Sequence, residues 1–120
     1  MQWRAVLLGL AVSVAIGYAA NIALAPTPGS AATIVGIGIG GFLAGKRAKA
    51  AGLYHGALVG LGWIALETFA LVPTVRYADD VVTDTVIVIA MDVATLAAGS
   101  LGGSLARRGP SSSSDTGRGR

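Results

Sequence analysis

The feature that most constrains this chain is a run of 41 consecutive residues, 5–45, without an Asp, Glu, Lys or Arg. An apolar stretch of about 18 or more residues with few charges is a candidate transmembrane helix, and this run is long enough for two. Over the whole chain 12% of the residues are charged, compared with roughly 25% in soluble domains. The sequence therefore predicts a polytopic membrane protein.

Four segments are apolar enough to cross a bilayer, and helix is their expected form because an unpaired backbone is costly in lipid. Pro73 and the prolines and glycine of 26–30 are expected to end spans. Thr83 or Asp84 is expected to cap the last span. We therefore expect an all-α integral membrane protein with four transmembrane helices in two antiparallel hairpins, in a domain of residues 1–108. The predicted spans are about residues 5–25, 31–45, 52–72 and 86–106.

Basic residues are distributed unevenly between the two sides of this topology. One side carries Arg4, Lys46, Arg47, Lys49, Arg107, Arg108, Arg118 and Arg120, and the other carries only Arg76. Because basic loops stay on the cytoplasmic side, both termini of this multi-pass protein of the plasma (inner) membrane are predicted to be cytoplasmic. We interpret Lys46, Arg47, Lys49, Arg107 and Arg108 as topology anchors. The Ser-, Gly- and Arg-rich tail at 109–120 is predicted to be disordered.

The first span has an alternative interpretation as a secretory signal. Arg4, an apolar run and Ala23-Leu24-Ala25 fit a signal with an A-x-A cleavage site. The run is longer than the roughly 7–15 residues of a usual signal core, so we prefer a span and keep the signal as the alternative.

The two predicted hairpins also show a weak internal similarity. Gly9 and Pro26 align with Gly56 and Pro73 at a constant offset of 47 residues. A duplication of this kind would relate the hairpins as parallel repeats.

Glycines recur at a spacing of four along the predicted spans. Such pairs let helix backbones approach closely in lipid. The glycines at 36, 38 and 41 also match a dinucleotide-binding fingerprint, but they lie in an apolar span without the βαβ context that the fingerprint requires. The predicted packing residues are Gly36, Gly40, Gly56, Gly60, Gly99 and Gly103, with Gly41 and Gly45 as a further pair.

Two acidic residues, Glu67 and Asp92, fall inside predicted spans, where an ionisable side chain costs about 2.5–3.5 kcal/mol. Each shares a helix face with the glycine pair of its own span. In an antiparallel hairpin with its apex near 79–80, the two acids would meet. Asn21 and Thr95 lie at a comparable depth, and these four residues form the candidate polar site.

The site has two interpretations, a clamp that sets helix register or a pathway for protons or small cations. No Lys or Arg lies within a predicted span. Two facing carboxylates cannot both stay charged in a low-dielectric layer without a cation. We therefore expect Glu67 and Asp92 to keep at least one proton between them, held with help from Asn21 or Thr95, unless a cation replaces it.

Several classes of site are disfavoured by composition. The chain has no cysteine and one histidine, His55, so no metal site is expected. The acids of 79–84 resemble an aspartate-rich diphosphate motif, but a second such motif is missing, and we interpret them as an outside loop. No cofactor, enzymatic activity or nucleic-acid partner is expected.

The stretch 40–63, GGFLAGKRAKAAGLYHGALVGLGW, carries a Gly-Gly-aromatic-x-Ala-Gly segment, a basic loop and a His-Gly-x-x-Val-Gly segment. It resembles the core of the small four-helix prokaryotic membrane proteins related to YrzE. The resemblance implies a prokaryotic inner-membrane protein of uncharacterised function, without catalytic residues to transfer.

The sequence thus favours a non-enzymatic membrane protein, structural or an accessory subunit. The alternative is a small oligomeric transporter or channel for protons or small cations that uses Glu67 and Asp92. The expected partners are the lipid bilayer and either further copies of the chain or another membrane protein.

Overall fold

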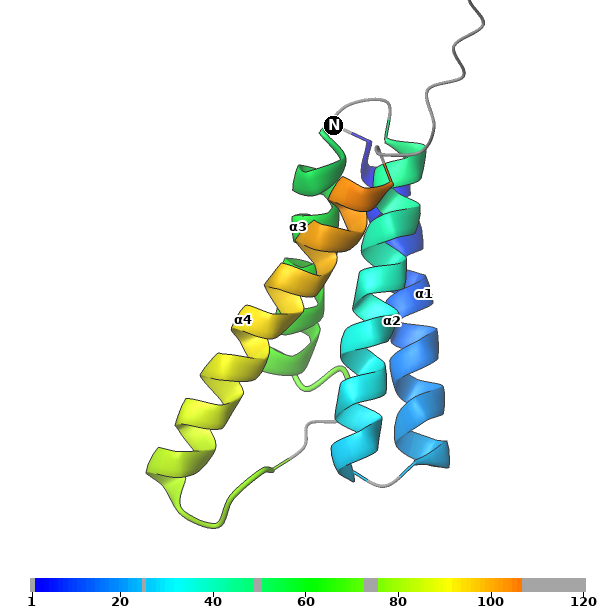
Figure 1. Cartoon of the computed structure of the whole chain (residues 1–120). Coiled ribbons are helices and arrows are strands. Elements are labelled where there is room, and N and C mark those ends of the chain that lie inside the picture. The colour runs from blue at the N-terminus through cyan, green and yellow to red at the C-terminus, as the bar shows by residue number, and fades with distance from the viewer. Residues whose placement is uncertain (1, 25, 49–50, 73–75, 107–120) are drawn as a thin grey trace, which may run out of the picture.

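The structure is a computed structural model that describes residues 2–24, 26–48, 51–72 and 76–106, without the side chains of 26–30. In these ranges the chain is all-helical and contains no strand, as expected (Figure 1). The four helices are α1 (Trp3–Ala23), α2 (Pro26–Arg47), α3 (Gly52–Thr68) and α4 (Val81–Leu105). The start of α1 and the end of α2 lie at one end of the molecule, which we name the basic end. Lys49, Arg107, Arg108 and the tail 109–120 lie outside the described residues.

The helix α2 begins five residues before the predicted span, at Pro26 rather than after Ser30. Pro26 and Pro28 do not prevent this, because the first N–H groups of a helix have no acceptor within it. The prolines therefore start the helix instead of separating it from α1.

The helix α3 ends at Thr68, four residues before the predicted limit. The N–H of Ala70 donates to the carbonyl of Glu67 at 2.9 Å, and that of Leu71 donates to Leu66 at 2.8 Å. This pair of bonds is a Schellman motif, in which the residue at position C′ takes a left-handed conformation. Ala70 does so with φ of 52°, although glycine is the residue that usually marks such an end.

The helix α4 begins at Val81 and is capped by Asp80, which corrects the expectation of Thr83 or Asp84. The Asp80 carboxylate accepts from the backbone N–H of Thr83 at 2.9 Å and from its hydroxyl at 2.8 Å. Asp84 instead accepts from the backbone N–H groups of Tyr77 and Ala78, at 2.7 and 3.1 Å. Both carboxylates therefore order the turn that leads into α4.

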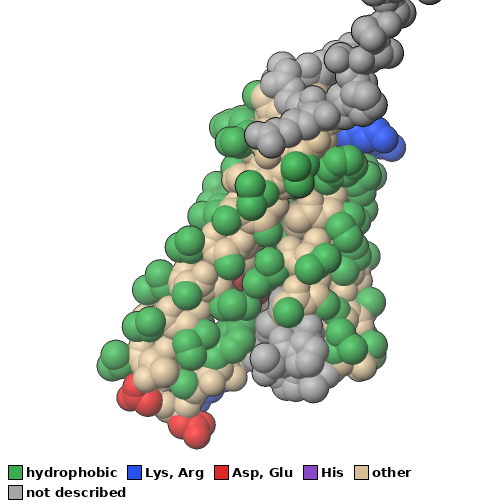
Figure 2. All heavy atoms as spheres, viewed as in Figure 1, with side chains coloured by type: hydrophobic (Ala, Val, Ile, Leu, Met, Phe, Trp, Pro, Cys, Tyr) green, Lys and Arg blue, Asp and Glu red, His purple; other side chains and the backbone are tan. Residues whose placement is uncertain are grey.

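Small residues fill the contacts between the helices, while large apolar side chains face outward (Figure 2). Two small apolar clusters complete the interior. One contains Val6, Ala44 and Val59, and the other contains Ile37, Trp63 and Val72. The segment after α3 thus turns back, because Val72 is buried with residues of α2 and α3.

The helix α4 packs on α2 and α3 through its C-terminal half only. Its buried residues are Thr95, Gly99, Gly102 and Gly103, whereas residues 81–94 are exposed or half-buried. Figure 1 shows α4 diverging from the other helices toward its own N-terminus. The N-terminal half of α4 therefore lies apart from the other helices at the end opposite the basic end.

Two helices, α1 and α4, are long and apolar enough to cross a membrane, with mean hydropathies of 2.0 and 1.9. This statement concerns the part of the chain that the structure describes. With 17 residues, α3 is at the short limit for a membrane span.

Candidate functional site

Glu67 lies in the last turn of α3 and Asp92 near the middle of α4, and both are half-buried. Trp63 lies one turn earlier on α3 than Glu67, and Asp92 acts on Glu67 electrostatically. No hydrogen bond in the described part of the chain joins the two carboxyl groups. The structure therefore brings the acids near each other without direct contact.

The ring of Trp63 on α3 is enclosed by residues of α1 and α2 and by Val72. It is 3% exposed and packs with Ile37 and Val72. A methyl group on Gly17 of α1 would lie 2.6 Å from its ring. A large aromatic ring thus fits only because the facing helix carries no side chain at this position.

Asn21 does not join the two acids. Its Nδ2 donates to the carbonyl of Gly17 at 2.8 Å and to the hydroxyl of Thr33 at 3.4 Å. It therefore links α1 to α2. The expected help in holding a proton between Glu67 and Asp92 does not come from this side chain in the structure.

Thr95 lies at the crossing of α3 and α4 and is 5% exposed. A methyl group on Gly60 would meet its carbonyl oxygen at 3.0 Å. One turn toward the basic end, a methyl group on Gly99 would meet the carbonyl oxygen of Gly56 at 2.5 Å. At the crossing, backbone therefore lies against backbone. Glu67 and Asp92 lie farther from the basic end than this crossing.

The glycines of α2 form two different faces. Gly36 and Gly40 face α1, where Gly36 lies against Ile16 and Gly40 against Gly9 and Ser13. Gly41 and Gly45 face α4 and lie against Gly99 and Gly103. The structure thus places all eight predicted packing glycines at helix contacts, and it makes α2 the helix that joins α1 to α4.

A stripe on α1 was missed from the sequence. Ala5, Gly9, Ser13 and Gly17 recur at a spacing of four and are all buried. The Ser13 hydroxyl donates to the carbonyl of Gly9 at 2.9 Å and to that of Gly36 on α2 at 3.4 Å. The repeated spacing was the available signal, but serine in the middle of it obscured the pattern.

His55 is also more deeply placed than its position near the basic loop suggested, with 6% exposure. Its Nδ1 lies 3.0 Å from the carbonyl oxygen of Ala51, and this contact requires the proton on Nδ1. Its Nε2 is buried and has no hydrogen-bond partner in the described residues. We assign no role to this atom.

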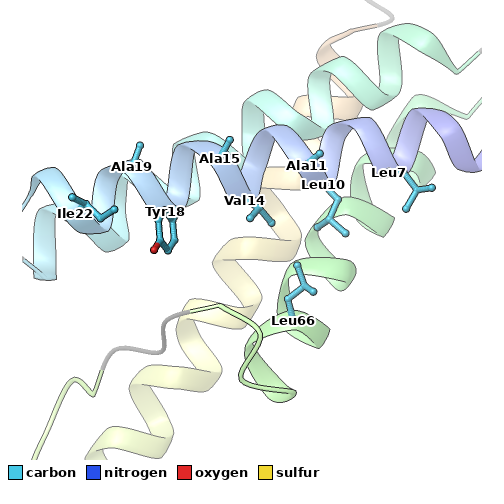
Figure 3. Close-up of a pocket in the computed structure, with 9 residues that line it drawn as sticks. All are labelled: Leu7, Leu10, Ala11, Val14, Ala15, Tyr18, Ala19, Ile22 and Leu66. Carbon is cyan, nitrogen blue, oxygen red and sulfur yellow. The ribbon is translucent and has the colours of Figure 1, made fainter.

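An apolar groove runs along the outside of α1 beside the end of α3 (Figure 3). Its volume is about 680 Å³. Leu10 and Leu66 point toward each other across it, and Tyr18 and Ile22 lie along its length. It is lined by Leu7, Leu10, Ala11, Val14, Ala15, Tyr18, Ala19, Ile22 and Leu66.

Chemically, the acid pair can exchange protons or bind a small cation, since carboxylate oxygens are hard ligands. No group of three or more His, Cys, Asp or Glu side chains in the described ranges could hold a metal ion. No protein-family model, curated protein or solved structure matches the chain. The similarity to YrzE-related proteins therefore stays a prediction, and the function must be argued from the geometry.

Proposed function

We propose that this chain is a non-enzymatic integral membrane protein whose four helices cross the plasma membrane, with both termini in the cytoplasm, and which acts as a structural or accessory subunit. The observation that carries the proposal is the inverted distribution of side chains. Small residues line the helix contacts, and large aliphatic side chains cover the surface. A water-soluble bundle of this size would bury those side chains instead.

The helix α4 gives the strongest support. In an apolar 18-residue stretch of α4, 6% of the residues are buried inside the protein. An apolar core helix of a soluble protein is mostly buried. Val82, Ile89 and Val93 are 71, 58 and 62% exposed. Continuous apolar surface of this kind is typical of contact with lipid or with another membrane helix.

The groove beside α1 supports the same environment. It is open, and its lining side chains are almost entirely hydrocarbon, so a lipid acyl chain is its natural occupant. Figure 2 also shows acidic atoms gathered where α4 begins, with a small group of basic atoms beside them, and a larger group of basic atoms near the opposite end. This separation of charge fits a protein whose basic end faces the cytoplasm.

Cysteine labelling tests the insertion and the topology. The chain has no cysteine, so single-cysteine variants need no background substitution. Asp79→Cys should react with a membrane-impermeant maleimide added outside intact cells, whereas Lys46→Cys should react only after permeabilisation. Both residues are exposed, so burial does not decide the result. The reverse pattern would refute the orientation, and extraction of the chain by alkaline carbonate would refute the insertion.

A second function, conduction of protons or small cations, is favoured by the placement of Glu67 and Asp92. Both carboxyls are partly accessible, and α4 diverges from the bundle on their side. An oligomer that packed further helices against the exposed half of α4 would enclose a polar path.

Flux measurements in proteoliposomes separate the two functions. If the acids conduct, Glu67→Gln together with Asp92→Asn should abolish a pH-gradient-driven flux, while Asp79→Asn should leave it unchanged. If the acids only set helix register, the wild-type protein should show no flux above empty liposomes. The double amide variant should then keep its melting temperature, because amides still form hydrogen bonds.

A further inference from the structure

A second hollow lies at the basic end, between the start of α1 and the last residue of α2. It has a volume of about 540 Å³ and is lined by Gln2, Trp3, Arg4, Ala5 and Arg47. The two helices are antiparallel neighbours, so residues 43 positions apart meet here. This hollow is separate from the acid pair and from the apolar groove.

The charge of this hollow is uncompensated within the described chain. Its two arginines are exposed and come from different helices. No Asp or Glu precedes Glu67 in the sequence, and Glu67 lies at the far end of α3. Two guanidinium groups therefore line one hollow without a carboxylate between them, which favours a bound anion.

The surroundings of the arginines specify the kind of anion. Trp3 is 58% exposed beside them, and indole rings concentrate at the headgroup level of a bilayer. The first turn of α1 has neither a side-chain cap nor an acid, so its N–H groups add to the positive potential. One turn along α1 from Arg4, Leu7 faces outward and is 61% exposed.

We propose that this hollow binds the phosphate headgroup of an anionic phospholipid of the inner leaflet, with Arg4 and Arg47 holding the phosphate oxygens and Trp3 beside the glycerol. The inference rests on the proposed membrane insertion, because the arginines reach a lipid phosphate only if the basic end lies at the headgroup level. Basic pockets between helices on the cytoplasmic side are a common way to bind such headgroups. A phosphate also matches the planar, two-pronged donors of arginine.

The test uses the full chain in nanodiscs of phosphatidylcholine that contain a minority of phosphatidylglycerol, with native mass spectrometry to measure the phosphatidylglycerol that each chain retains. Arg4→Gln with Arg47→Gln should lower retention about fivefold per arginine. The matched control, Lys46→Gln with Arg76→Gln, removes the same two charges from residues that do not line the hollow. It should change retention much less.

Three results would overturn the proposal. Equal losses in the two double variants would show diffuse attraction rather than a site. Retention that is unchanged by Arg4→Gln with Arg47→Gln would exclude the arginines. A melting shift with inorganic phosphate as large as that with phosphatidylglycerol would show a site for free phosphate.

Flotation with neutral phosphatidylcholine vesicles distinguishes these failures from failure of membrane insertion. A wild-type chain that does not float would refute both proposals. A chain that floats in every variant, and loses phosphatidylglycerol only with Arg4 and Arg47, would support the site.

Discussion

The two halves of α4 are both apolar overall, but only one of them packs against the other helices. The half from Thr95 to Leu105 is buried against α2 and α3 through Gly99, Gly102 and Gly103. The half from Val81 to Ala94 contains no glycine, and none of its residues is buried. Hydrophobicity does not decide which half packs, because the half that packs has no valine or isoleucine and the exposed half has seven. The half that packs is the one with small side chains.

This comparison shows what holds the bundle together. In the membrane that we propose for this chain, valine and isoleucine gain little by leaving lipid for a protein interface, since lipid tails are equally apolar. Glycines let two backbones touch, which adds many dispersion contacts per residue. The glycine-rich half of α4 therefore packs, and the valine-rich half is left facing outward.

The largest effect should come from closing the space that a glycine leaves. Gly99→Leu would place a side chain where the backbone of Gly56 lies, and overpacking of this severity should lower stability by at least ~3 kcal/mol. Val93→Leu, in the exposed half, should change it by less than about 0.5 kcal/mol. Chemical denaturation in mixed micelles measures both. Similar losses in the two variants would contradict the assignment of the halves.

A graded series of alanine substitutions should sharpen the comparison. The added methyl group would lie 2.6 Å from the carbonyl oxygen of Gly103 in Gly45→Ala, and 3.7 Å from that of Ala98 in Gly38→Ala. We expect a loss of about 1–2 kcal/mol for Gly45→Ala. Gly38→Ala should instead gain up to ~1 kcal/mol of helix propensity. The same denaturation curves test this order, and a reversed order would be evidence against the α2–α4 contact.

The early end of α3 is testable through Ala70, whose left-handed conformation suits glycine better. Ala70→Gly should stabilise the protein by roughly 0.5–1 kcal/mol, as measured by melting in detergent. Ala65→Gly, at an exposed position inside α3, should destabilise it by a similar amount. If α3 continued through residue 72, both substitutions would be destabilising.

The smallest effect concerns the cap of α4. The N–H and hydroxyl of Thr83 lower the pKa of Asp80 below its ordinary value, because both donate to the charged carboxylate. The Asp80 cap therefore contributes fully to stability above about pH 3.9, the ordinary pKa of aspartate in an unfolded chain. This contribution is lost as the pH falls through the lower pKa of Asp80 in the folded protein. Asp80→Asn keeps a capping side chain but removes this part of the pH dependence.

Unfolding curves taken between neutral and strongly acidic pH should show a smaller acid-induced loss in Asp80→Asn than in the wild-type protein. Asp79→Asn removes one carboxylate from the same turn and serves as the charge-matched control. Parallel curves for the wild-type protein and Asp80→Asn would show that the cap contributes nothing measurable.

The sequence by itself determined that the chain is helical and which glycines of α2, α3 and α4 lie at helix contacts, but not the packing face of α1. A run of 41 residues without charge allows only apolar helices, and a glycine spacing of four assigns those residues to one face. The positions of the basic residues likewise predicted that most of them lie at one end of the molecule. These properties depend on local periodicity and composition, which do not change when the helices are arranged differently.

Only the tertiary structure decided which partner each face meets. Stripes of small residues are nearly interchangeable, so spacing could not show that Gly36 and Gly40 face α1 while Gly41 and Gly45 face α4. The depth of Asn21 along its helix was known from the sequence but the direction of its side chain was not, so Asn21 was expected to reach Glu67 and Asp92. In the structure it bonds to Thr33 instead. The end of α3 at an alanine, and the meeting of Arg4 with Arg47, likewise depend on how the helices cross. Direction and crossing are set by contacts between segments distant in sequence, and no local pattern records them.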